Sequence, residues 1–156
     1  MTLESKIVIE FGIPEYGWLP TSLSYESFEL KLDISNVPLD PMVQLCDALV
    51  GINRGIREPR RVIWHLEPYC YYLQLEELED CYKATILESD EFDSPTKATI
   101  EITGSFEKII LPFYRALKKF WSKSFRQPHW DELDPERIEE LSGLIKKKKN
   151  ITARNS

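Results

Sequence analysis

The sequence is poor in the residues that build most catalytic, phosphate-binding and metal sites. Its six glycines are dispersed over 156 residues, and no GxSxG, HExxH or CxxC motif occurs. The two histidines, His65 and His129, are far apart in the chain. A zinc site needs three or four Cys or His ligands close together. The sequence therefore predicts no catalytic residues, no metal site and no cofactor.

Cysteines and long apolar runs are also scarce. The three cysteines, Cys46, Cys70 and Cys81, are an odd number, and we interpret them as reduced thiols of the core. No segment approaches the ~20 apolar residues that span a bilayer. The first residues, MTLESKIVIEF, lack the apolar stretch of an export signal. We therefore expect a cytoplasmic protein without membrane contact.

Acidic residues outnumber basic ones in residues 1–145, whereas the end of the chain is basic. The formal net charge is −6, and residues 146–156 contain five Lys or Arg and no acid, which leaves −11 for residues 1–145. An acidic body repels phosphates over most of its surface, which disfavours nucleic acid as a partner. The same charge attracts a basic protein and speeds its association.

Two hydrophobic periodicities alternate along the chain. In residues 27–34 every second residue is apolar, which is the pattern of a half-buried strand. Asp40 and Pro41 precede apolar residues at helical spacing and are typical of a helix start. These patterns predict strands at 7–11, 27–34, 60–67, 69–75, 81–87 and 97–103, with 18–24 undecided. They also predict a helix at 41–53, a second helix that ends at 121, and a third from 135 to about 148.

This order of elements predicts an α+β fold. Short connections between strands favour antiparallel pairing. We expect a curved antiparallel β-sheet of about six to seven strands, with a helix after the third strand and two C-terminal helices. It would form a single domain over 1–149, followed by a frayed tail at 150–156. Pro112 lies inside the apolar stripe of the second helix, so this helix either bends there or begins near Ile110.

Two segments resemble small bacterial immunity-type proteins of polymorphic toxin systems. They are the run Trp64–Pro68 with the tyrosine-rich strand that follows, and the helical sequence FYRALKKFW at 113–121. The resemblance is one of layout, namely size, acidic body, curved antiparallel sheet and late aromatic helix, and it covers most of residues 1–130. It implies a protein that binds and blocks a cognate toxin and is not an enzyme.

A non-enzymatic protein-binding domain is therefore the leading hypothesis. The candidate contacts are one tyrosine that alternation places on the solvent side of its strand and four acids of the following turn: Tyr72, Glu76, Glu77, Glu79 and Asp80. A basic toxin or a similar protein is the expected partner. The late rings Trp121, Phe125 and Trp130 either close the core under the third helix or, if that helix docks elsewhere, form a homo-oligomer interface.

Two alternatives from other classes stay open. A single-stranded nucleic-acid-binding domain would use the basic cluster beside the aromatic strands: Arg54, Arg57, Arg60 and Arg61. The element order is also similar to Whirly-like single-strand binders, which have four strands before each helix where this chain has two or three before the first. A small-molecule enzyme or ligand-binding protein would be built around His65 and Glu67, which one strand would place on a shared face. The other interpretation of this pair is two exposed polar residues.

Overall fold

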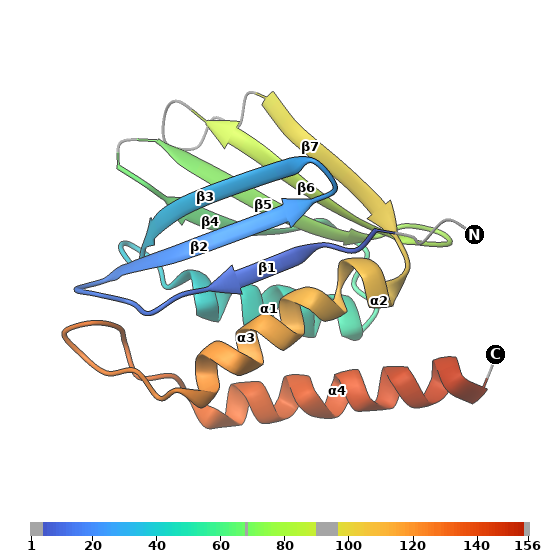
Figure 1. Cartoon of the computed structure of the whole chain (residues 1–156). Coiled ribbons are helices and arrows are strands. Elements are labelled where there is room, and N and C mark those ends of the chain that lie inside the picture. Colours follow the sequence, from blue (N-terminus) through green and yellow to red (C-terminus); the bar gives the residue numbers. More distant parts are fainter. Residues whose placement is uncertain (1–4, 68, 90–96, 155–156) are drawn as a thin grey trace.

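The protein is described by a computed structural model, which covers residues 5–67, 69–89 and 97–154. One antiparallel sheet contains the strands in chain order from β1 to β7, with helices packed against it (Figure 1). The predicted α+β fold is confirmed. The elements are β1 (Val8–Phe11), β2 (Trp18–Tyr25), β3 (Phe28–Ser35), α1 (Pro41–Asn53), β4 (Arg60–His65), β5 (Cys70–Glu77), β6 (Tyr82–Ser89), β7 (Lys97–Gly104), α2 (Phe106–Ile109), α3 (Leu111–Ser122) and α4 (Pro135–Arg154).

The sheet is strongly curved and has a weak joint between β3 and β4. These two strands pair only at Ser35 and His65, whereas β2 and β3 pair over their full length. Figure 1 shows β1–β3 crossing in front of β4–β7, with the helices below. Where β3 diverges, α1 covers β4, and the Ile63 N–H donates to Gln44 Oε1 at 3.0 Å. A helix side chain thus replaces a strand partner for a partly buried backbone donor.

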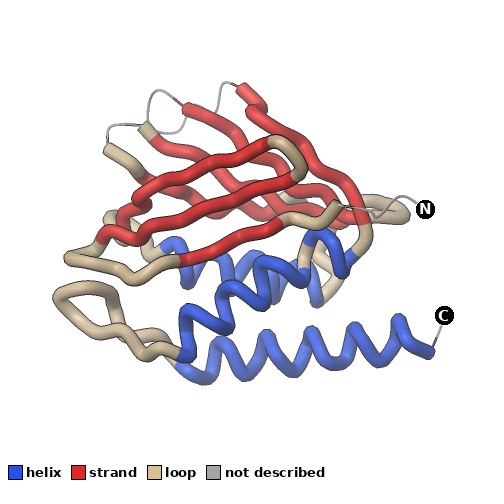
Figure 2. The backbone as a smooth tube through the Cα atoms, in the orientation of Figure 1, coloured by secondary structure: helices blue, strands red, loops and turns tan. Residues whose placement is uncertain are grey.

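The core lies between the inner faces of the curved sheet and the helices (Figure 2). Strand alternation brings Val62 and Trp64 of β4 to the inner face, and both are at most 1% exposed. From α3, the buried Phe113 and Leu117 face the same cluster. The long α4 lies outside α1, with Leu141 pointing inward. Strand and helix periodicity therefore converge on one hydrophobic cluster.

The two C-terminal helices begin where the sequence indicated, but the last one ends later than expected. The second helix is divided at Ile110 into α2 and α3, so the chain bends there and Pro112 occupies the first turn of α3. Proline is tolerated in that position because the amide has no intrahelical partner to lose. The last helix extends to Arg154, beyond the predicted end near Lys148. Helix therefore includes most of the tail that we expected to fray, and residues 155–156 lie outside the described ranges.

Asp40 caps α1 as predicted, and its carboxyl group is perturbed. Its Oδ1 accepts a hydrogen bond from the Met42 N–H at 2.8 Å. Burial raises the pKa of this carboxyl above its ordinary value of 3.8, the Met42 hydrogen bond opposes the rise, and the charge of Asp131 adds to it. The folded state therefore binds a proton more readily than the unfolded state. The contribution of Asp40 to stability consequently increases as the pH falls through the folded pKa.

An Asp40→Asn variant keeps a good cap but removes this titration. The free energy of unfolding of the natural protein, relative to that of Asp40→Asn, should increase as the pH falls from 7 to 4. Urea denaturation of both proteins at several pH values measures this difference. A constant difference, or one that changes in the opposite direction, would show that the carboxyl is not perturbed.

Candidate functional site

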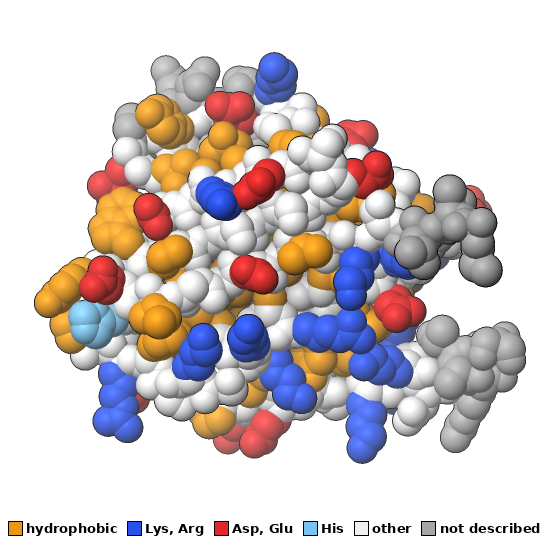
Figure 3. Space-filling model, viewed as in Figure 1, with side chains coloured by type: hydrophobic (Ala, Val, Ile, Leu, Met, Phe, Trp, Pro, Cys, Tyr) orange, Lys and Arg blue, Asp and Glu red, His pale blue; other side chains and the backbone are white. Residues whose placement is uncertain are grey.

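Exposed apolar side chains gather at one end of the sheet, around the β1–β2 turn and the β3–α1 connection. Five of the nine exposed large hydrophobic residues in the described ranges lie there. We call these five residues the apolar patch: Ile13, Tyr16, Trp18, Val37 and Leu39. Their exposed fractions run from 38% to 71%. Figure 3 shows hydrophobic side chains on the surface at this end of the molecule.

A tight turn between β1 and β2 holds Tyr16 outward. Glu15 and Trp18 exchange two backbone hydrogen bonds, at 2.9 and 3.0 Å. The two residues between them, Tyr16 and Gly17, have φ values of 48° and 83°, as a type I′ hairpin turn requires. A non-glycine residue in this region carries strain of about 1–3 kcal/mol. The surrounding structure therefore holds an exposed tyrosine in an unfavourable backbone conformation.

Two distant segments fix this turn in place. The Tyr16 N–H donates to His129 Nδ1 at 3.2 Å, and the Gly17 N–H donates to the His129 carbonyl at 2.8 Å. The Tyr16 and His129 rings meet edge to face at 4.8 Å. On the other side, the Asn36 N–H donates to the Gly17 carbonyl at 3.0 Å, and a Cβ on Gly17 would lie 2.7 Å from Asn36 Oδ1. Three parts of the chain thus build the patch.

Sequence reasoning missed this site. The signals were Pro14, Gly17 and Pro20, which indicate a break in the chain but not which segments pack against it. The undecided segment 18–24 is a full strand, β2, and this strand holds Trp18 beside the β3–α1 connection. Long-range contacts to His129 have no local sequence signature.

The predicted partner surface is only partly exposed. Tyr72 is only 4% exposed, so its predicted exposure is wrong. Its strand neighbours are Ile63 and Leu87, and the Arg61 guanidinium lies 5.7 Å from the centre of its ring. Alternation places Tyr72 on the face away from the helices, but long neighbouring side chains cover that face.

The four turn acids divide into two pairs. Glu76 forms an ion pair with Lys83 at 3.3 Å, and Glu77 accepts from the Tyr82 hydroxyl at 3.4 Å. These two carboxylates therefore support the β5–β6 hairpin. Glu79 and Asp80 are exposed at the tip. The strand registers place this tip at the opposite end of the sheet from the apolar patch.

The four arginines of the nucleic-acid alternative do not form one surface. Arg54 pairs with Glu140 of α4, whereas Arg60 and Arg61 point to opposite faces of β4. The Arg60 side chain lies against Gly51 of α1. The Arg61 Nε donates to Gln74 Oε1 at 2.9 Å on the outer face. Arg57 is exposed in the α1–β4 connection.

The pair of the small-molecule alternative is also separated. His65 is 4% exposed at the β3–β4 joint, opposite Ser35 and Cys70. Glu67 is exposed beyond the end of β4, where its φ of 53° shows that the strand has ended. The expectation that both share one strand face is therefore wrong, and so is the interpretation of His65 as exposed. Neither residue lines either of the two cavities described at the surface.

The Cys46 thiol of α1 is buried and poorly suited to reaction. Burial raises the pKa of the Cys46 thiol to about 12, with a smaller contribution from the charge of Asp47. A thiol with this pKa is a poor nucleophile because the thiolate is the reactive form. The described ranges contain no group of three or more His, Cys, Asp or Glu side chains placed to hold a metal ion.

The late aromatic rings close the core under α4. Trp130 is fully buried, Trp121 is 8% exposed, and Phe125 is half-buried. Phe120 contacts both Phe125 and Trp130, with ring centres 5.1 and 5.9 Å apart. Of the two interpretations, the structure supports core closure, because Trp121 and Trp130 are buried while α4 is docked and the half-buried Phe125 packs against Phe120.

Comparisons with protein-family models, with curated proteins and with solved structures found no match to this chain. Among the described residues, no helix is long and apolar enough to cross a membrane. The fold and the apolar patch are therefore the observations on which a functional proposal can rest.

Proposed function

We propose that this chain is a non-enzymatic protein-binding protein that docks through the apolar patch. Contiguous exposed apolar side chains mark protein-interaction sites on monomeric domains. Tyrosine and tryptophan are enriched among the few residues that dominate binding energies, and Tyr16 and Trp18 stand next to each other in this patch. The clustering of five exposed apolar side chains at one end of the sheet carries the proposal.

The rigidity of the patch supports the same proposal. The β1–β2 turn is held by its own two hydrogen bonds and by contacts to His129 and Asn36. A surface that is already ordered loses little conformational entropy when a partner binds, so more of the contact energy appears as affinity. The strained φ of Tyr16 fits a residue retained for contact rather than for stability.

The charge of the chain indicates what kind of partner would bind. The net charge is −6, and the exposed carboxylates of Glu15 and Asp33 lie beside the patch. A partner with an apolar pocket inside a basic surface would be complementary in both respects. Toxins that cleave nucleic acids need basic surfaces to hold their substrate. In its finer form, the proposal is therefore an immunity-type protein that neutralises a basic bacterial toxin.

A double variant, Tyr16→Ala with Trp18→Ala, tests the patch. The tagged natural protein should capture one stoichiometric partner from its native lysate at low salt, and nuclease treatment should not release this partner. The double variant should bind the purified partner at least about 30-fold more weakly, which corresponds to about 2 kcal/mol. Calorimetry or surface plasmon resonance with the purified partner measures the loss.

Tyr69→Ala is the matched control, because Tyr69 is 53% exposed and lies outside the patch. Its affinity should stay within about twofold of the natural protein. Charge reversal at Glu79 and Asp80 examines the opposite end of the sheet, and it should reduce the association rate without changing the dissociation rate. Full binding by the double variant would reject the patch as the docking site. So would faster dissociation in the Glu79 and Asp80 reversal, if only that variant lost binding.

A further inference from the structure

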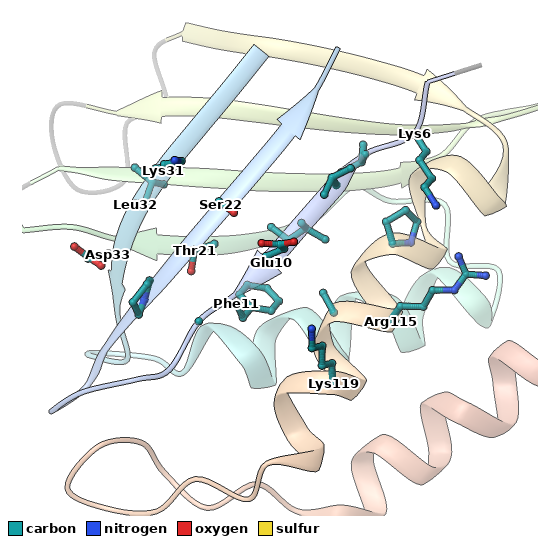
Figure 4. A pocket seen from close by; sticks show the side chains of 17 residues that line it. Lys6, Glu10, Phe11, Thr21, Ser22, Lys31, Leu32, Asp33, Arg115 and Lys119 are labelled. Atoms are coloured by element: carbon teal, nitrogen blue, oxygen red, sulfur yellow. The ribbon is translucent and has the colours of Figure 1, made fainter. Parts of the chain in front are cut away.

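A second surface feature, which adjoins the apolar patch at the end of β1, is a groove of about 650 Å³ along this strand. It is bounded by the consecutive residues 6–12, by the outer surface of β2 and β3, and by one face of α3 (Figure 4). Its volume lies within the range of about 300–1,000 Å³ that is usual for ligand sites. Ala116 of α3 contributes the smallest side chain of the helix face that lines it.

The groove follows the edge of β1 that faces away from β2. The Gly12 N–H donates to the Pro20 carbonyl at 2.7 Å, so the even-numbered residues of β1 bond to β2 and the odd-numbered residues point away. Ile7 follows the same alternation, because its N–H points away from β2 and donates to the Lys108 carbonyl at 3.3 Å. Within the described ranges, the outward N–H and C=O groups of Ile9 and Phe11 have no backbone partner.

The groove is basic although the chain is acidic. Four cationic side chains line it, Lys6, Lys31, Arg115 and Lys119, against the two carboxylates of Glu10 and Asp33. Its lining therefore carries a net charge of +2 in a chain with a net charge of −6. Figure 4 shows Arg115 and Lys119 on the α3 side of the groove, with Lys6 just before β1. Figure 3 shows Lys and Arg side chains gathered over α3.

We propose that this groove binds an extended acidic segment of a partner polypeptide. The segment would add a strand to the free edge of β1, with its backbone bonded to Ile9 and Phe11. Its carboxylates would face Arg115 and Lys119 across the groove. Strand addition is a common mode of peptide recognition, in which backbone hydrogen bonds give affinity and side chains give specificity.

The backbone groups favour a polypeptide over a nucleic acid. Ile9 and Phe11 offer alternating donors and acceptors at strand spacing, and another extended peptide presents the complementary groups at the same spacing. A phosphate backbone offers acceptors but no donors, so the two free carbonyl groups of the edge would stay without partners. The acidic character of the segment follows from the charge of the lining.

The probe is a fluorescein-labelled peptide of four Glu-Val repeats, titrated with the full chain and followed by fluorescence anisotropy. We expect saturable binding below about 1 mM. The double variant Arg115→Glu with Lys119→Glu should bind at least about tenfold more weakly, because attraction is replaced by repulsion. Lys118→Glu is the matched control, since Lys118 is an exposed neighbour on α3 outside the groove, and its affinity should stay within about threefold.

Two further measurements separate strand addition from charge attraction alone. The same peptide with alternate backbone nitrogens methylated keeps its carboxylates but cannot complete the ladder, so its affinity should fall at least about tenfold. In amide hydrogen exchange by NMR, Ile9 and Phe11 should be slowed by the unmethylated peptide, whereas Glu10, which already bonds to β2, should not.

Three outcomes would overturn the proposal. They are no saturable binding of the Glu-Val peptide, equal binding of the methylated peptide, and stronger binding of a dodecamer of deoxythymidylate than of the peptide. The third outcome would identify a nucleic acid as the ligand of the groove. Circular dichroism of each variant shows that a loss of binding does not come from unfolding.

Discussion

Replacing Trp130 by alanine should lower the free energy of unfolding by about 3–5 kcal/mol. Trp130 is fully buried although it belongs to the connection between α3 and α4. Its ring packs edge-on against Phe120, and its backbone N–H donates to the Arg126 carbonyl at 3.1 Å. Removing the ring leaves a large cavity at a point where the loop and helix α3 meet, and a packed interior cannot close such a cavity fully.

Guanidinium denaturation of Trp130→Ala and of Trp18→Ala measures this effect against a matched change. Trp18 is 38% exposed, so its replacement should change the free energy of unfolding much less. Equal losses in the two variants would mean that the α3–α4 connection is not part of the core. The same denaturation of the Tyr16→Ala, Trp18→Ala double variant shows whether its loss of partner binding is a loss of fold.

Replacing Leu141 by aspartate should detach α4 or unfold the chain, at an expected cost above about 3 kcal/mol. Leu141 is fully buried on the face of α4 that packs against α1, with Ile145 one turn further. A carboxylate at this position would lose its hydration without gaining a partner. The hydrogen bond between the Tyr114 hydroxyl and Ser142 Oγ, at 2.8 Å, should be lost with the helix contact.

Hydrogen exchange of the α4 amides, together with urea denaturation, measures this detachment. Ile151→Asp is the control on the same helix, because Ile151 is 51% exposed and its replacement should leave both measurements nearly unchanged. Unchanged protection of α4 in Leu141→Asp would show that the helix is not held by this face. Detachment would expose the late aromatic rings, and the association state of the variant would then test the oligomer alternative directly.

The apolar patch and the groove meet at the end of β1. Gly12 lines the groove, and the next residue, Ile13, belongs to the patch. The test variants nevertheless act on different elements, since Tyr16 and Trp18 lie at the β1–β2 turn whereas Arg115 and Lys119 lie on α3. Each proposal can therefore fail without the other.

Local patterns predicted most of the secondary structure, for identifiable reasons. The alternation in 27–34 and the cap at Asp40 fixed β3 and α1 because these signals involve residues close in the chain. The same reasoning indicated the direction in which Tyr72 points but not its burial. Burial depends on Arg61, Ile63 and Leu87, which belong to neighbouring strands.

The sequence by itself determined the α+β class, the antiparallel pairing of the strands, the acidic body and the lack of motifs for catalysis or metal binding. Only the tertiary structure decided where surfaces form. The His129 contacts to Tyr16 and Gly17 cross more than 100 residues, and the groove needs β1 and α3 side by side. Such contacts follow from the curvature of the whole sheet and the docking of helices on it, and no local periodicity encodes either.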